Sequence, residues 1–197
     1  NIGGLAVGMA VAIGIGLWVY DELSFNTYHR HYDHVAQVMQ KTTANGQVFT
    51  GQALPYPLGN ELQTVYGSNF KYIVMSSWSF DQILSFGEKK ISKRGNFMDV
   101  DAPRMLSLAM RQGTHDGLRD PHSILIAEST ARALFGAANP LNRLIKLGNS
   151  DVRVTGVYED LPFNSGFREL TFVAPWSLYA IVNSSVREAR EEAKWDD

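Results

Sequence analysis

The chain opens with a run of 19 residues, Ile2–Tyr20, that contains no charged side chain. As an α-helix rising about 1.5 Å per residue, such a run approaches the ~30 Å thickness of the hydrocarbon core of a bilayer. Trp18 and Tyr20 stand at its end and two acidic residues follow at once. Amphipathic rings followed by charges are typical of a membrane–water interface. We therefore expect residues 1–20 to form a transmembrane helix.

Two other interpretations of this run are weaker. A signal peptide needs a small-residue cleavage site, which the segment from Trp18 to Asp21 does not offer. A buried helix of a soluble protein would be weakened by the five glycines of the run, by up to ~1 kcal/mol each. The sequence starts with Asn1 rather than Met and is apolar from the start, so we interpret it as a fragment cut at its N-terminus.

Small residues recur at every fourth position of the expected membrane helix, at Gly4, Gly8, Ala12 and Gly16. This spacing places them in one ridge, on which a second membrane helix can pack closely. A run rich in Gly and Ala also produces such a spacing by chance. The four residues are candidates for a helix-packing site.

Charge and cysteine content exclude several classes of function. The net charge is −2, which provides no basic surface for nucleic acid. The absence of cysteine rules out a disulfide framework, a thiolate metal site and a thiol nucleophile. The sequence also lacks the GxxxxGK[ST] phosphate loop and the GxSxG and HExxH motifs. We expect no catalytic residue, no cofactor and no metal.

After Glu22 the chain mixes polar and apolar residues, and no later run is long enough to cross a bilayer. Short apolar or alternating stretches predict strands. These stretches are His34–Thr43, Phe70–Met75, Ile83–Phe86, Leu106–Met110, Ser123–Ile126 and Val152–Val157. Helices are predicted over Pro57–Tyr66, over Glu128–Phe135 and from about Pro175, with a turn at Gly95-Asn96. Strands alternating with a few short helices indicate a mixed α/β domain of the α+β class.

Two groups of residues deserve a test as reactive sites. His29, His31 and His34 lie close together beside Asp33 and could be metal ligands. On a helix, however, His29 would not face the same side as both other histidines. A polar juxtamembrane segment at headgroup depth therefore explains the three histidines better than a metal site. Asp99 and Asp101 would share a face of a strand as an acid/base pair or a cation site. Aspartates at such positions more often cap loops. The tail, 187–197, is expected to be a solvated charged helix.

One segment makes the sequence recognisable. Residues 123–136, SILIAESTARALFG, resemble the strand–helix segment of the MacB-like periplasmic core domain. Other motifs occur in the order that the family has. They are Phe97–Pro103, Gly117-Leu118, Asn139-Pro140-Leu141, Val152–Val157, Glu159-Asp160-Leu161-Pro162 and Asn164-Ser165. The N-terminal helix, which runs into Asp21-Glu22-Leu23-Ser24-Phe25 and then Tyr28-His29 and Asp33, is similar to the Bacteroidetes-type branch of the family.

The resemblance implies a permease subunit of an FtsX-like ABC transporter in the bacterial inner membrane. Residues 1–20 would be its transmembrane helix, 21–33 a juxtamembrane segment and 34–197 a partial core domain in the periplasm. A permease homodimer or heterodimer would bind a cytoplasmic ABC ATPase subunit that hydrolyses ATP, while this chain stays non-catalytic. Membrane lipid and a periplasmic protein are further expected partners, and nucleic acid is not.

The resemblance also implies how the domain works. It would transmit ATP-driven motion for the export or extraction of an antibiotic, a peptide or a lipoprotein. Asp21, Glu22 and Leu23 lead from the helix to the domain without Gly or Pro, so they are candidates for a stiff coupling link. The alternatives are a membrane-tethered sensor that binds a ligand and a membrane-anchored hydrolase.

The sequence departs from the family pattern at two places. Ala127 stands where the family commonly has Ser or Thr, so the helix from Glu128 is expected to lack an N-cap acceptor. The chain stops at Trp195-Asp196-Asp197, where family members resume a strand on the way back to the membrane. The rest of the core domain and the other membrane helices are therefore expected beyond this sequence.

Overall fold

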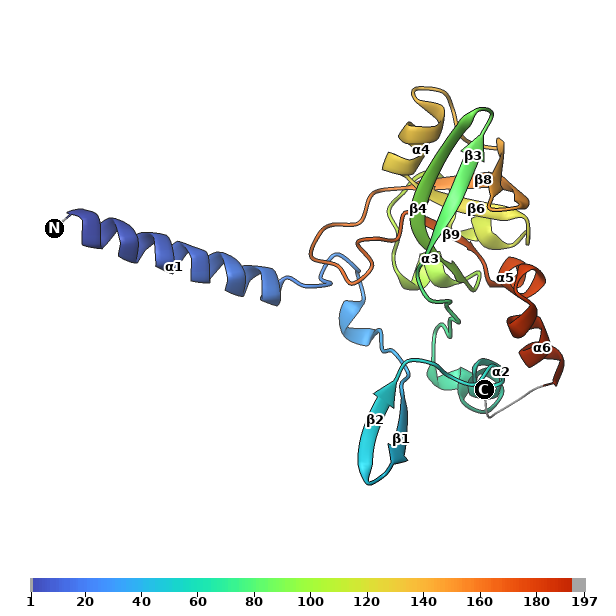
Figure 1. Cartoon of the computed structure of the whole chain (residues 1–197), viewed down its shortest axis with the longest axis horizontal. Coiled ribbons are helices and arrows are strands. Elements are labelled where there is room, and N and C mark those ends of the chain that lie inside the picture. The colour runs from blue at the N-terminus through green and yellow to red at the C-terminus, as the bar shows by residue number, and fades with distance from the viewer. Residues whose placement is uncertain (1, 193–197) are drawn as a thin grey trace.

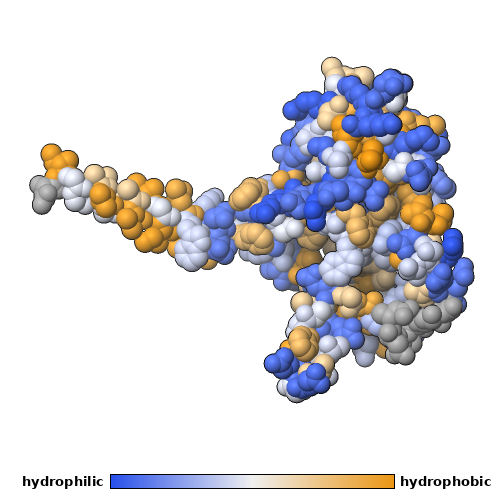
Figure 2. Space-filling model, viewed as in Figure 1, coloured by the Kyte–Doolittle hydropathy of each residue, from blue (hydrophilic) through white to orange (hydrophobic). Residues whose placement is uncertain are grey.

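The computed structural model of the protein describes residues 2–192. Its first element, α1 (Ile2–Leu23), is one long helix that projects away from the rest of the molecule (Figure 1). None of its residues is buried, and its surface is mostly apolar, in contrast to the largely polar surface of the domain (Figure 2). The helix is long and apolar enough to cross a membrane.

A mixed β-sheet forms the body of the molecule. Within residues 2–192 it has seven strands, in the order β5-β8-β6-β9-β4-β3-β7. Their bounds are β3 (Phe80–Phe86), β4 (Lys89–Met98), β5 (Met110–Gly113), β6 (Ser123–Ala127), β7 (Leu144–Leu147), β8 (Ser150–Tyr158) and β9 (Phe172–Pro175). The β4–β9 and β6–β8 pairs are parallel and the others are antiparallel. Because β7 pairs with β8 as well as with β3, the sheet closes on itself.

The two faces of the sheet bury two separate clusters. Along β6, Ile124 and Ile126 belong to the first cluster and Leu125 to the second, as the two-residue period of a strand requires. Helices α4 (Glu128–Phe135) and α5 (Trp176–Val182) contribute to the first cluster. The second is covered by α3 (Ala102–Met105) and the 3-10 helix η3 (His115–Leu118).

A smaller part of the chain lies below the sheet in Figure 1. It contains the 3-10 helix η1 (Tyr32–His34), the hairpin of β1 (Gln40–Ala44) and β2 (Gln47–Gly51), then α2 (Leu58–Tyr66), and the 3-10 helix η2 (Gly67–Asn69). Both strands of the hairpin are exposed along their whole length. The final helix, α6 (Ser184–Glu192), includes the first part of the predicted charged tail, and residues 193–197 lie outside the described residues.

The α+β class predicted from the sequence is confirmed, and so are several elements. The predicted helix from Glu128 to Phe135 has those bounds in the structure, and Gly136 follows it with a φ of 63°. Helix α5 begins directly after Pro175, as predicted. Helix α1 continues past the predicted end at Tyr20 to Leu23.

Three predicted strands differ from the structure. Residues 70–75 form no strand, and only a single bridge joins Ser76 to Met98. The strand predicted from Leu106 begins at Met110, because Leu106 caps α3 and Ser107 then turns the chain with a φ of 52°. The strand predicted from His34 begins at Gln40, since η1 precedes it.

The prediction of a turn at Gly95-Asn96 was wrong, because both residues lie inside β4. A Cβ atom at Gly95 would clash with the backbone oxygen of Phe172 in the neighbouring segment. The glycine therefore permits close backbone approach within a sheet. The side chain of Asn96 is satisfied there, since its Nδ2 donates to the carbonyl oxygen of Ser77 at 2.8 Å.

Candidate functional site

The end of α1 is attached to the sheet domain by a set of hydrogen bonds. Residues 24–29 lie against residues 162–167, and we call these two segments together the clasp. The amide of Asn26 donates to the carbonyl oxygen of Asn164 at 2.7 Å. In return, Asn164 Nδ2 donates to the carbonyl oxygen of Ser24 at 3.0 Å and to its Oγ at 2.8 Å. The domain thus holds the chain at the first residue after the helix.

Local geometry explains why the chain can turn into the clasp. Asn26 has a φ of 63°, a left-handed conformation that asparagine adopts more readily than most residues. Its side chain is then free to accept a hydrogen bond from the amide of Gly166, at 2.7 Å. Asn26 thus turns the chain away from the helix axis and also hydrogen-bonds to the opposite segment of the clasp.

His29 is buried in the clasp, with 3% of its surface exposed, and its partner Ser165 is buried too, with 1% exposed. Its Nδ1 lies 2.7 Å from the carbonyl oxygen of Leu106, which can only accept, so Nδ1 carries the proton. Its Nε2, 3.0 Å from Ser165 Oγ, then accepts from that hydroxyl in the neutral ring. The rings of Tyr28 and Phe167 contact the imidazole edge-on, with centroids 5.4 and 5.6 Å away.

The aromatic residues of the clasp connect it to the second core cluster. Tyr28 and Phe167 are partly buried and pack against that cluster. Burial raises the pKa of the Tyr28 phenol above its usual value. The clasp is therefore continuous with the hydrophobic core as well as hydrogen-bonded to it.

The three clustered histidines do not act together. His29 points into the core and uses both ring nitrogens there, whereas His31 and His34 are exposed. The side chain of His29 is not part of a polar surface, because the fold buries it against Leu106 and Ser165, whereas the juxtamembrane position of the segment remains a prediction. Among residues 2–192, no cluster of three or more His, Asp or Glu side chains is arranged to hold a metal ion.

The other predicted site residues lie on α1. Asp21, Glu22 and Leu23 form its last turn and are exposed, adjacent to the clasp. Gly4, Gly8, Ala12 and Gly16 are exposed too, and among the described residues nothing lies within 4 Å of a Cβ placed at the three glycines. Their packing and coupling roles therefore remain predictions.

Asp99 and Asp101 have separate structural roles. Asp99 Oδ2 accepts a hydrogen bond from the amide of Met75 at 2.7 Å, and burial raises the pKa of its carboxyl group. Asp101 is the N-cap residue of α3 and lies 3.9 Å from the guanidinium of Arg104. Neither arrangement points to acid/base chemistry.

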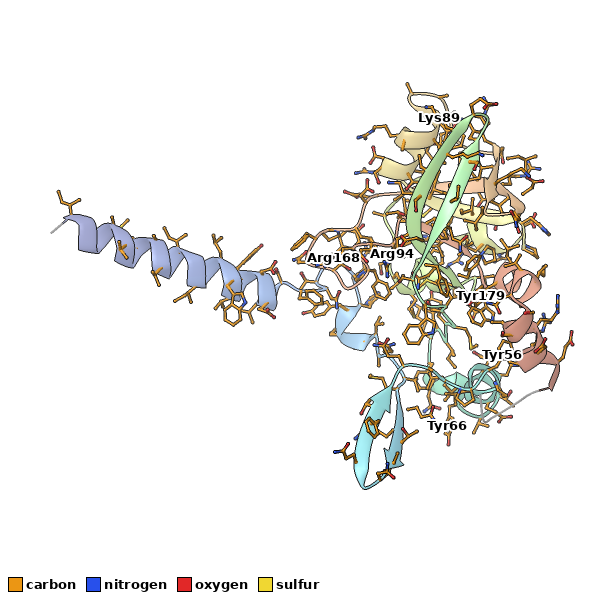
Figure 3. All side chains as sticks on the ribbon, viewed as in Figure 1. Tyr56, Tyr66, Lys89, Arg94, Arg168 and Tyr179 are labelled. Carbon is orange, nitrogen blue, oxygen red and sulfur yellow. The ribbon has the colours of Figure 1, made fainter. Side chains whose placement is uncertain are left out.

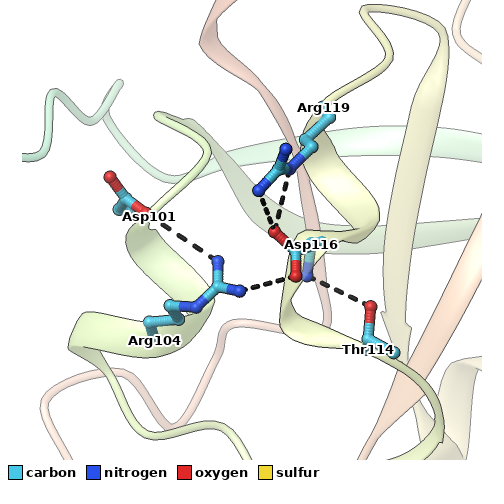
Figure 4. A network of polar contacts seen from close by, with 5 residues as sticks. All are labelled: Asp101, Arg104, Thr114, Asp116 and Arg119. Atoms are coloured by element: carbon cyan, nitrogen blue, oxygen red, sulfur yellow. Dashed lines mark hydrogen bonds and ion pairs between the residues drawn. The ribbon is translucent and has the colours of Figure 1, made fainter.

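Arg104 also leads into an ion-pair network that joins α3 to η3 (Figure 4). Asp116 accepts from Arg104 and from Arg119, and these hydrogen bonds lower the pKa of its carboxyl group. Thr114 Oγ1 caps the same turn by accepting from the amide of Asp116. The network braces the surface over the second core cluster.

The helix that follows Ala127 is capped by a residue from elsewhere in the chain. Ala127 is the N-cap residue and supplies no side-chain acceptor, as predicted. The carboxylate of Asp160 takes this role, because it accepts from the amide of Ser129 at 3.0 Å and from its hydroxyl. The expectation of an uncapped helix was therefore wrong, and the Asp160-Leu161-Pro162 motif both ends β8 and caps α4.

Sequence reasoning missed the clasp because its two segments lie 140 positions apart. Asn164 and Ser165 were recognised as a motif, but nothing in a single sequence pairs them with Ser24 and His29. The one available signal was the density of turn-forming polar residues in both segments.

The overall fold is similar to that of three solved structures. A domain named as part of a permease protein of Porphyromonas gingivalis matches with a TM-score of 0.58 at 17% identity, covering 77% of this chain and 61% of that one. The periplasmic region of MacB from Actinobacillus actinomycetemcomitans matches with a TM-score of 0.53 at 22% identity, covering 72% and 73%. The extracellular domain of the noncanonic ABC-type transporter YknZ from Gram-positive bacteria matches with a TM-score of 0.50 at 22% identity, covering 63% of each chain.

At these identities the matches describe the fold. The chain spans less than two thirds of the length of the first and third of these structures. No curated protein sequence matches it significantly. The sequence profile of the MacB-like periplasmic core domain, however, matches residues 1–194. The chain therefore belongs to the family of MacB-like periplasmic core domains, which occur in permeases of ABC-type transporters.

Proposed function

We propose that this chain is the first membrane helix and part of the periplasmic domain of an ABC-transporter permease, and that it transmits ATP-driven motion from the inner membrane to the periplasm. The observation that carries the proposal is the clasp. Helix α1 runs without a break to Leu23, and the next residue, Ser24, is already hydrogen-bonded to Asn164. A displacement of the helix is then passed to the domain without a flexible joint between them.

The rest of the proposal follows from the family and from α1. A separate cytoplasmic ATPase subunit would hydrolyse ATP, and two permeases would form a homodimer or heterodimer. The ridge of Gly4, Gly8, Ala12 and Gly16 is suited to contact another membrane helix, since small side chains permit close approach. The cargo would be an antibiotic, a peptide or a lipoprotein, with a periplasmic protein as a further partner.

The test is a Gly/Ser insert of about ten residues after Leu23 in the full-length permease. Such a coil lets its ends drift apart by roughly 16–19 Å. It adds loop entropy without removing a core contact, so membrane insertion and folding should persist. Transport in reconstituted vesicles should fall sharply while the ATPase subunit continues to turn over uncoupled.

A matched control places the same insert after Gly87, in the exposed turn between β3 and β4. This variant should transport like the parent protein. Undiminished transport with the insert after Leu23 would contradict the coupling role. A domain that only tethers a ligand-binding sensor would tolerate both inserts.

A further inference from the structure

The loop that forms one half of the clasp carries an exposed aromatic ring. Phe163 is 75% exposed, although Leu161 and Ser165 on either side of it are buried. The backbone of the loop is therefore fixed by the core while this ring is held in solvent. This large apolar ring is therefore open to contact from outside the chain.

A cation accompanies the ring. The guanidinium of Arg168 lies 4.9 Å from the centroid of Phe163, a cation–π distance. Arg168 is exposed, and within residues 2–192 it forms no ion pair. The pair thus offers an apolar surface and an unneutralised positive charge at one place.

The position of this pair is determined by the clasp. Asn164, the neighbour of Phe163, is hydrogen-bonded to Ser24, the first residue after α1. The loop extends from the sheet toward the end of α1 (Figure 1), and Arg168 lies on that side of the domain (Figure 3). Two more exposed apolar side chains, Leu23 and Phe25, lie at the same junction.

We propose that Phe163 and Arg168 form a second membrane contact of the domain, in which the ring enters the interface and the guanidinium binds a lipid phosphate. The inference rests on the proposed membrane span of α1. If Trp18 and Tyr20 mark the membrane–water interface, the Phe163 loop, which is hydrogen-bonded to Ser24, lies at headgroup depth. A phenylalanine ring can insert at the boundary between headgroups and acyl chains, and arginine binds phosphate oxygens in a bidentate manner.

Such a contact would fix the tilt of the domain. A single helix leaves the domain free to rotate about the helix axis, whereas a second contact beside it removes that freedom. The domain would then keep one orientation relative to the bilayer surface while it moves as a rigid body with α1.

The absence of cysteine from the sequence permits site-specific labelling without background. A nitroxide is attached at Phe163→Cys, and the 197-residue chain is reconstituted in vesicles that contain phosphatidylglycerol. We compare how often the nitroxide collides with oxygen, which enters the bilayer, and with a nickel chelate, which stays in water. Val11→Cys in the middle of α1 reports the bilayer, and Ile83→Cys, an exposed apolar position on β3, reports water.

The proposal predicts an oxygen-to-nickel ratio at Phe163→Cys several-fold above that at Ile83→Cys and below that at Val11→Cys. Adding Arg168→Glu should move the ratio toward that of Ile83→Cys. A ratio equal to that of Ile83→Cys, with Val11→Cys in the bilayer, would overturn the lipid contact and leave the span intact. Equal ratios at all three positions would overturn the span as well.

A protein partner on this loop gives a different result. If a second copy of the chain covers Phe163, the label is shielded from both reagents, and the shielding grows with the protein-to-lipid ratio. That outcome would overturn the lipid contact. The oxygen-to-nickel ratio expected for lipid does not change with protein density.

Discussion

The Nε2 atom of His29 lies 3.0 Å from the Oγ atom of Ser165, although the two residues are 136 positions apart in the sequence. This contact joins the segment that leaves α1 to the loop that leaves β8. It is buried, and it is reinforced by the bond from His29 to Leu106. The domain therefore includes the segment after the helix in its own core.

Replacing His29 by alanine should destabilise the domain by about 2–4 kcal/mol, because the carbonyl of Leu106 and the hydroxyl of Ser165 each lose a buried partner. His34→Ala is the matched control, since its side chain is 78% exposed and its loss should change stability by less than about 0.5 kcal/mol. Denaturant unfolding in detergent micelles, followed by tryptophan fluorescence, measures both. Equal midpoints for the two variants would contradict the clasp.

The capping of α4 predicts a loss of stability at one position and no gain at another. Asp160→Ala removes the acceptor of the Ser129 amide and should cost about 1 kcal/mol. Ala127→Ser should bring no gain, because the amide already has its acceptor and Ala127 is 1% exposed, so the added hydroxyl would be buried. A clear rise in the unfolding midpoint of Ala127→Ser, with Asp160→Ala unchanged, would show that Asp160 is not the cap.

Asp99 makes stability depend on pH in an unusual direction. Burial raises the pKa of its carboxyl group, so the folded protein holds this proton more tightly than the unfolded chain. The protonated Asp99 carboxyl group therefore adds to the free energy of unfolding below about pH 4, the ordinary pKa of aspartate. This stabilisation is lost as the pH rises through the raised pKa of the folded protein. Asp99→Asn keeps an oxygen for the Met75 amide and removes the charge, so the variant should be the more stable one at pH 7.

Unfolding midpoints of the parent protein and of Asp99→Asn, measured from pH 4 to pH 8, give this difference directly. The unfolding midpoint of Asp99→Asn should exceed that of the parent protein by an amount that grows as the pH rises. Asp101→Asn is the control, because Asp101 is partly exposed and paired with Arg104. A gap that narrows with rising pH would show that the charged form of Asp99 is the stabilising one.

The sequence predicted best the elements whose signals are local. The helix over Glu128–Phe135 combines an apolar face with a glycine directly after it, and both signals act within one segment. The apolar run of α1 and the strand before α4 are of the same kind. These features were sufficient to predict the fold class, whereas the family resemblance needed several motifs in order along the chain.

The errors occurred where a distant segment decides the local structure. Gly95 is typical of a turn, but here it lets the backbone at Phe172 approach β4. His29 lies in a polar stretch, yet Leu106 and Ser165 bury it. Asp160 was interpreted only as part of a strand-ending motif, although it also caps a helix that begins 32 positions earlier in the sequence. Long-range pairings of this kind cannot be derived from a single sequence.

Movement of α1 and the domain as one body is tested most directly by a distance measured across the clasp. Spin labels at Asp21→Cys, in the last turn of α1, and at Lys89→Cys, at the far end of the β3–β4 hairpin (Figure 3), avoid the clasp itself. Pulsed electron resonance on the full-length permease with its ATPase, with labelled protein diluted into unlabelled protein, should give a narrow distance within one subunit that is the same with and without bound nucleotide. The Gly/Ser insert after Leu23 should broaden it. A distance that shifts or broadens with nucleotide in the protein without the insert would contradict rigid coupling through the clasp.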